Sequence, residues 1–258
     1  MSWSALGRKA AKSTVLPWGL IRRRRNDDVV ILLYHRVGSG EREIDLPVDA
    51  FARQLELLAA HGDLLTLDQA LEGRSGGVVL TFDDGFIDFH QHVLPLLVRH
   101  SAPALLYLAT GLVANGKRDA DSLTWDQLSE ATSTGLVTIG AHTHSHADLS
   151  TVSEAVAADE MIRCKELIED RLGTQCAHFS YPWSYCSAGA DRAARRLFYS
   201  AALLWGTNRG GKTNRYRLGR TPVLRSDGPL LFRAKTLGML DGEAQIYKLL
   251  RRGPWKRS

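Results

Sequence analysis

Short apolar segments alternate along this chain with segments in which apolar residues recur every three or four positions. Residues 29–34 (VVILLY) are typical of the first kind, with the length and β-branched content of a strand buried on both faces. Residues 47–60 are typical of the second kind, because Phe51, Leu55 and Leu58 fall on one face of a helix. The alternation predicts strands and helices that follow one another rather than two separate blocks.

The same pattern extends over most of the chain. Strands are predicted at residues 29–34, 78–82, 104–109, 137–141, 179–181, 200–204 and 217–224. Helices are predicted at residues 47–60, 92–99, 125–131, 154–172 and 191–198. Strands that alternate with helices pair in parallel, and the loops after their carboxyl ends carry the chemistry in such folds. We therefore expect one α/β domain, barrel-like or doubly wound, with reactive residues just after the predicted strands.

Composition changes this picture at the two ends of the chain. The 258 residues, 44% of them apolar, suffice for one domain with a sizeable core. The net charge is +5, yet residues 1–25 carry seven Lys and Arg, residues 248–258 carry five, and neither segment has an acidic residue. We therefore divide the chain into a basic N-terminal segment (1–28), one folded domain (29–240) and a basic C-terminal tail (241–258).

The basic ends favour attachment to an anionic membrane surface, with a solvated tail as the alternative. No nucleic-acid recognition motif accompanies the charge, so nucleic acid is not an expected partner. Residues 13–21 are too interrupted for a signal-peptide core, and no segment is long and apolar enough to predict a transmembrane helix. Cys164, Cys176 and Cys186 have no metal-binding or disulfide spacing. The expected location is cytoplasmic, peripheral at the inner membrane face.

Two adjacent carboxylates, Asp83 and Asp84, follow the predicted strand at residues 78–82, in the segment TFDDG. Such carboxylates repel each other unless a positive group neutralises one of them. A metal ion would do this and would leave the other carboxylate free as a general base. Gly85 would permit the sharp turn that such a site requires, although this tripeptide taken alone is more typical of an ordinary turn.

A histidine pair, His142 and His146, follows the predicted strand at residues 137–141. Histidines at i and i+4 lie on one face of a helical turn and can reach one ion. With Asp84 they offer two nitrogens and a carboxylate, which leaves positions for water and substrate. Zinc is the expected divalent ion, and cobalt, nickel, manganese or iron would fit the same ligands. His144 is expected to point elsewhere.

Together, these two motifs resemble those of the polysaccharide deacetylase family, the NodB-homology or carbohydrate esterase family 4 group. The resemblance spans residues 29–224 and implies a single-domain, irregular (β/α) barrel with fewer than eight strands. It implies that Asp83 is the catalytic base and that Asp84, His142 and His146 bind the metal ion. The implied substrate is an acetylated amino sugar in a glycan or glycan precursor.

The segment FSYPW resembles a family motif that lines the substrate groove, which implies substrate contacts for Tyr181, Pro182 and Trp183. In relatives the N–H after the proline, here that of Trp183, helps to stabilise the oxyanion. The arginine found in the common form of this motif is absent, so Arg220 is the candidate to orient Asp83. The alternatives are core packing for the two aromatic residues and a surface salt bridge for Arg220.

No histidine follows His178, although many relatives place a catalytic histidine late in the chain. The segment LLYHRV instead resembles a permuted branch of the family with a Y-H motif near the N-terminus. The resemblance implies that His35 is the general acid; a satisfied, partly buried histidine is the alternative. The expected reaction is sugar N-deacetylation. The alternatives are an O-acetyl esterase and a non-catalytic protein that binds carbohydrate or a membrane surface.

Overall fold

A computed structural model describes residues 28–38, 40–61, 64–74, 76–113, 121–204, 208–209 and 213–238. The two basic segments that the sequence sets apart, residues 1–28 and 241–258, lie outside these residues except for Asp28. Within the described ranges, none of the helices combines the length and the apolar character needed to cross a membrane.

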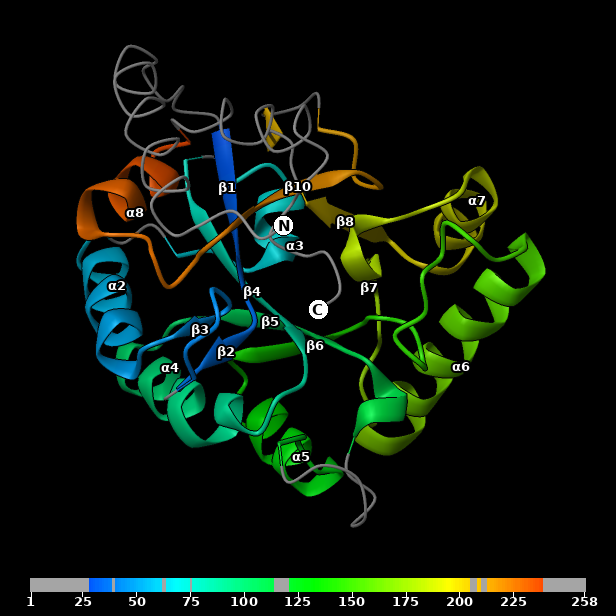
Figure 1. Cartoon of the computed structure of the whole chain (residues 1–258), viewed down its shortest axis with the longest axis horizontal. Helices are drawn as coiled ribbons and strands as arrows, with labels where there is room; N and C mark the ends of the chain where they lie inside the picture. Colours follow the sequence, from blue (N-terminus) through cyan, green and yellow to red (C-terminus); the bar gives the residue numbers. More distant parts are fainter. Residues whose placement is uncertain are drawn as a thin grey trace.

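A closed barrel of parallel strands forms the centre of the described structure (Figure 1). The seven strands follow one another around the barrel in chain order, and they are β1 (Asp28–Tyr34), β4 (Val78–Asp84), β5 (Ala104–Leu108), β6 (Val137–Ala141), β7 (His178–Ser180), β8 (Ser200–Leu204) and β10 (Leu218–Pro222). The barrel closes where β10 pairs with β1, with Leu32 opposite Thr221. A short strand, β9 (Asn208–Arg209), pairs antiparallel with β1. The predicted irregular barrel with fewer than eight strands is therefore confirmed.

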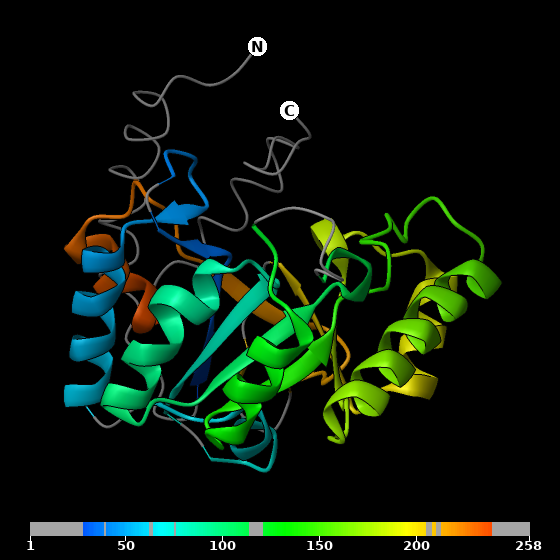
Figure 2. The same cartoon turned by 90° about the horizontal axis from the view of Figure 1, so that it is seen from below.

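Helices cover the outside of the barrel. Those close to predicted ranges are α2 (Val48–Ala60), α4 (Leu94–His100), α5 (Trp125–Ser133), α6 (Glu154–Leu172) and α7 (Ala188–Leu197). Figures 1 and 2 show α6 and α7 side by side on one flank, with α2 and α4 on another. Side-chain oxygens of Thr124, Ser153 and Ser187 accept backbone N–H groups at the starts of α5, α6 and α7, which explains where these helices begin.

Several short elements escape prediction, most of them because they span too few residues for a periodic pattern. They are the strand pair β2 (Arg36–Val37) and β3 (Asp45–Leu46), the helices α3 (Leu67–Leu71) and α8 (Pro229–Thr236), the π-helical segment η1 (Phe89–Val93) and the 3₁₀ turns η2 (Thr110–Leu112) and η3 (Pro182–Ser184).

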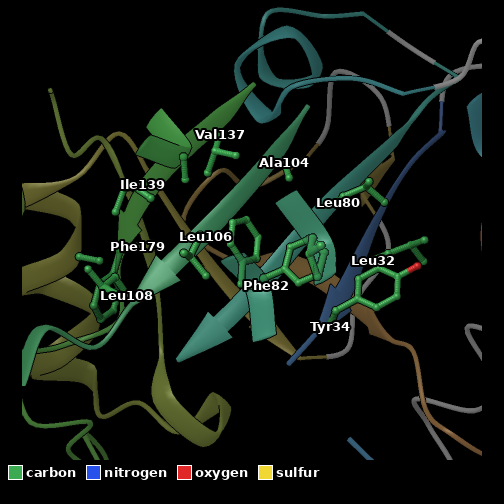
Figure 3. Packing of buried hydrophobic residues seen from close by; sticks show 14 of the residues in the cluster. Leu32, Tyr34, Leu80, Phe82, Ala104, Leu106, Leu108, Val137, Ile139 and Phe179 are labelled. Carbon is green, nitrogen blue, oxygen red and sulfur yellow. The ribbon is translucent and has the colours of Figure 1, made fainter. Parts of the chain in front are cut away.

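Side chains of the barrel strands alternate between two apolar layers. Those that point outward pack against the helices and include Leu32, Leu80, Leu106 and Phe179 (Figure 3). Those of the opposite parity face the barrel interior, and the buried ones include Ile31, Val79, Leu105, Tyr107, Ala202 and Leu218. At the carboxyl ends of the strands, polar residues occupy the positions that face the barrel interior. Apolar side chains therefore fill the barrel interior below Asp83, His142 and Arg220.

Candidate metal centre and active site

The chain turns sharply where β4 ends. Asp83 follows the alternation of its strand and faces the barrel interior. Asp84 has a φ of +77° and Gly85 a φ of +92°. A positive φ in a non-glycine residue stores about 1–3 kcal/mol and is typical of functional sites. The φ of Gly85 is one that residues with a Cβ rarely adopt, and a Cβ on Gly85 would also lie 2.5 Å from Leu108 Cδ1, so the turn favours glycine. The turn aims the second carboxylate at the same rim of the barrel as the first.

Asp84, His142 and His146 come together at this rim. Their ligand atoms all lie within 4.8 Å of one another, and no other such trio of His, Cys, Asp or Glu occurs in the described ranges. Asp84 Oδ1 lies 3.6 Å from His142 Nε2 and 3.2 Å from His146 Nε2. This oxygen is buried and has no hydrogen-bond partner among the described residues. A buried carboxylate oxygen that faces two imidazole nitrogens fits a divalent ion.

The loop that carries the two histidines is not the helical turn that their spacing suggests, so this part of the prediction is wrong. Thr143 and His146 have φ values of +65° and +59°. Tertiary contacts replace helical hydrogen bonds: the His144 N–H donates to the Glu160 carbonyl, and the His144 carbonyl accepts from the Gly111 N–H. His144 Nδ1 lies 2.9 Å from Thr110 Oγ1, and its ring therefore points elsewhere, as expected.

The tautomer of His142 follows from one contact. Its Nδ1 lies 2.8 Å from the carbonyl oxygen of Ser180, which can only accept a hydrogen bond, so Nδ1 carries the proton. The lone pair of Nε2 is then free on the side of Asp84. Burial lowers the pKa of His142 to about 4, against the opposing influence of Asp83. The ring is therefore neutral at physiological pH, as a metal ligand must be.

Arg220 holds Asp83 through two hydrogen bonds. Its Nη1 and Nη2 donate to Oδ1 and Oδ2 of Asp83 at 2.6 and 2.7 Å. Arg220 is 2% exposed, so the alternative of a surface salt bridge is wrong. Burial raises the pKa of Asp83 and Arg220 lowers it, with a net value below the ordinary range. The carboxylate is therefore ionised at neutral pH, and its Oδ2 lies 3.7 Å from His142 Nε2.

His35 follows β1 at the same rim. Burial lowers the pKa of its imidazole, and the charges of Asp84 and Asp83 oppose that shift. Arg220 and His146 act on it in the same direction as burial. The fold thus brings this histidine into electrostatic contact with residues far along the chain.

The segment FSYPW is divided between core and site. Tyr181 is 1% exposed, and its ring packs edge-to-face on Phe179 with centroids 4.9 Å apart, which is the core packing left open as an alternative. Pro182 is buried as well. Trp183 has a φ of +57°, and its ring contacts that of His146 at a centroid distance of 4.6 Å. Substrate binding by this segment stays a prediction, carried by Trp183 and the backbone.

Residues that support Arg220 are missing from the sequence prediction. Thr81 Oγ1 accepts from Arg220 Nη1 at 3.4 Å and donates to the Leu32 carbonyl at 2.7 Å. The Arg220 guanidinium lies over the ring of Tyr107, 5.1 Å from its centroid, and Ser180 Oγ is 2.6 Å from Nη2. The alternation of side chains along each strand was the available signal. It indicates that these residues face the barrel interior, but it does not indicate that they lie next to one another.

Comparisons with known proteins identify a family and a fold. A family model described as polysaccharide deacetylase matches residues 71–202. YxkH of Bacillus subtilis (strain 168), a protein named for the same family, is 25% identical over 191 residues. The matched segment covers 71% of this chain and 66% of YxkH, just under two thirds of that relative's length.

Solved structures share the fold. The deacetylase PplD of Streptococcus pyogenes, in complex with acetate, has a TM-score of 0.74 and 24% identity, over 82% of this chain and 99% of that chain. IcaB from Ammonifex degensii has a TM-score of 0.72 and 25% identity, over 87% of this chain and 100% of that chain. The barrel is therefore of the NodB type.

Proposed function

The chain belongs to the polysaccharide deacetylase family, and we propose that it removes N-acetyl groups from an amino sugar in a glycan or glycan precursor. Family membership supports carbohydrate deacetylation. The N-acetyl bond, the metal dependence and the residue roles are the proposal. The observation that carries it is the trio of Asp84, His142 and His146 beside a buried carboxylate, that of Asp83, which Arg220 keeps ionised.

Asp84, His142 and His146 would hold one divalent ion, zinc by default, with cobalt, nickel, manganese or iron as the other candidates. When bound, the ion would supply Lewis-acid activation of water and of the acetyl carbonyl. The residues fit such an ion because His142 is neutral with Nε2 unprotonated, and because Asp84 Oδ1 is buried without a hydrogen bond.

Asp83 is the proposed base. As water adds to the acetamide carbon, the carboxylate accepts its proton, and negative charge develops on the acyl oxygen. Arg220 fixes the orientation of this carboxylate, so that Oδ2 faces the trio. The backbone N–H of Trp183 is the proposed donor to the acyl oxygen; one such donor contributes about 2.7–4 kcal/mol. The contact between Trp183 and His146 supports this placement.

His35 is the proposed acid. An amine is a poor leaving group unless it is protonated, and His35 would donate this proton to nitrogen as the carbon–nitrogen bond breaks. Acetate and a free amino sugar are the products. The carboxylates of Asp84 and Asp83 raise the pKa of His35, but burial outweighs them and lowers it. The protonated ring would therefore give up its proton readily.

His35→Ala should lower kcat on an N-acetyl sugar by at least about 100-fold, because general acid catalysis contributes that much. The loss on a matched O-acetyl sugar should be much smaller, since an alkoxide needs less protonation than an amine. Acetate release from the two substrates measures both effects. His90→Ala is the control, because His90 pairs with Glu130 at 2.8 Å on the surface. If His35→Ala hydrolysed the amide at the wild-type rate, another residue would be the general acid.

The reaction class is tested by measuring acetate release from acetylated sugars, both soluble and lipid-linked, with metal-loaded protein. Release from N-acetyl sugars supports the proposal. Release from O-acetyl sugars alone would make the protein an esterase that uses the same residues. No release from any of them, with the metal bound, would contradict an enzymatic role.

For the basic segments, residues 1–28 and 241–258, we propose attachment to an anionic membrane surface, with the domain at residues 29–240 held at the cytoplasmic face. The concentration of Lys and Arg at both ends supports this. Each basic residue near such a surface contributes about 1 kcal/mol. The full chain should sediment with vesicles of phosphatidylglycerol but not with vesicles of phosphatidylcholine, and salt should release it. Equal binding to both kinds of vesicle would contradict the electrostatic attachment.

A further inference from the structure

Ser180, at the end of β7, contacts both halves of the proposed site. Its backbone carbonyl accepts the Nδ1–H of His142 at 2.8 Å, which orients one proposed metal ligand. Its hydroxyl oxygen lies 2.6 Å from Nη2 of Arg220, the residue that holds the proposed base. Ser180 is fully buried, so solvent does not compete for either contact.

The hydroxyl of Ser180 completes the hydrogen bonding of one Arg220 nitrogen. Nη2 has two hydrogens; one is directed at Asp83 Oδ2, 2.7 Å away, and the other at Ser180 Oγ. With both hydrogens engaged, the guanidinium cannot rotate without the loss of a charged hydrogen bond. A buried charged donor without an acceptor is costly, and Arg220 Nε already lacks a partner among the described residues.

Two further contacts hold the guanidinium of Arg220. The Tyr107 ring covers one face, and Thr81 Oγ1 lies 3.4 Å from Nη1. The Thr81 hydroxyl donates its hydrogen bond to the Leu32 carbonyl, so a lone pair of Oγ1 is available to accept from Nη1. Of these contacts, the one with Ser180 is made by a residue that also binds His142. Its position therefore relates Arg220 to the metal side of the site.

We propose that Ser180 is a positioning residue that sets where Asp83 stands relative to the metal ligands. Its carbonyl holds His142 and its hydroxyl holds Arg220, which in turn holds Asp83 3.7 Å from His142 Nε2. Ser180 acts through these residues and not on the substrate. The inference rests on the proposed function, because it assigns Ser180 a part in the same reaction. A displaced reacting group slows a reaction steeply, about 100-fold for 1 Å.

The test is Ser180→Ala in the full-length, metal-loaded protein. Alanine keeps the carbonyl that binds His142, so metal content and KM should stay as in the wild type. Loss of the hydroxyl should lower kcat on an N-acetyl sugar by about 10-fold, the value of one hydrogen bond to a charged group. A residue with a merely structural role would not affect kcat while KM and metal content stay constant.

Ser200→Ala is the matched control. Ser200 is also fully buried, lies on the neighbouring strand β8 and contacts His178 Nδ1 at 2.9 Å instead of Arg220. The variant removes an equally buried hydroxyl, and its kcat should stay near the wild-type value. An equal loss of kcat in the two variants would overturn the positioning role.

A second measurement does not depend on turnover. The ¹⁵N NMR signals of the Arg220 Nη groups should show slow rotation in the wild type and in Ser200→Ala, and faster rotation in Ser180→Ala, in which only the hydrogen bonds to Asp83 and the weaker contact with Thr81 remain. If the wild type releases no acetate, the proposed function fails and the NMR signals alone decide on Ser180. Unchanged Arg220 signals in Ser180→Ala, or an unchanged kcat in an active enzyme, would overturn the inference.

Discussion

Asp83→Asn is expected to lower kcat on an N-acetyl amino sugar by about 10²–10⁴-fold, the usual contribution of a general base. The asparagine amide has nearly the same shape as the carboxylate but cannot accept the proton of the attacking water. Asp84, His142 and His146 are untouched, so the variant should still bind one metal ion. Steady-state rates of acetate release and elemental analysis of the purified variant measure both quantities.

This substitution also leaves Arg220 with a buried charge that has lost its ionised partner, which is destabilising by about 3–5 kcal/mol. Asp227→Asn is the matched control, because Asp227 forms a buried ion pair with Lys235 at 2.6 Å. It should lower the free energy of unfolding while kcat stays near that of the wild type. Substantial turnover by folded, metal-loaded Asp83→Asn would show that another group is the base.

His142→Ala and His146→Ala are each expected to remove the metal and, with it, the activity. Each variant deletes one of the three ligands whose atoms lie within 4.8 Å of one another, and two ligands hold a divalent ion far less tightly than three. Acetate release should fall to the level of wild-type protein treated with a chelator. Addition of zinc should restore the treated wild type but not the variants.

His144→Ala tests whether any histidine of this loop would have the same effect. His144 lies between the two proposed ligands, but it contacts Thr110 rather than the trio. This variant should keep one metal ion per chain and most of the activity. The proposed ligand set would be wrong if His142→Ala retained a full complement of metal, or if His144→Ala lost it.

Much of the barrel could be predicted from sequence because its strands are buried on both faces. A segment such as residues 29–34 is apolar at every position and needs no knowledge of its neighbours to be recognised. The elements that escaped, such as α3 (Leu67–Leu71), are too short for a period to be counted. The structure of α3 depends instead on a capping box between Thr66 and Gln69.

The grouping of Asp84, His142 and His146 could be predicted from the sequence, but the geometry of the loop that carries the two histidines could not. The spacing of His142 and His146 suggests a helical turn, whereas the described loop uses two left-handed residues and tertiary hydrogen bonds. Such bonds join segments far apart in the chain, and no local pattern encodes them. The same limit applies to Ser180, because its contact with Arg220 exists only when the barrel has closed.

The burial of Tyr181 shows a related limit. An aromatic residue in a motif is equally suited to pack in the core or to contact a sugar, and the sequence left both interpretations open. The structure places its ring against Phe179, whereas the ring of Trp183 lies against His146. The backbone differs at the two positions, because Tyr181 is extended whereas Trp183 has a positive φ.

The central claim is that a metal ion held by Asp84, His142 and His146 works with Asp83 to cleave an N-acetyl bond. The most direct measurement is the release of acetate and free amine from an N-acetylglucosamine oligosaccharide, by wild type and by Asp83→Asn. Each protein is assayed after chelation and again after zinc is restored. We predict equal amounts of acetate and amine from the zinc-loaded wild type, with only background release in the other three samples. Release that is unchanged by chelation, or that Asp83→Asn matches, would contradict the claim.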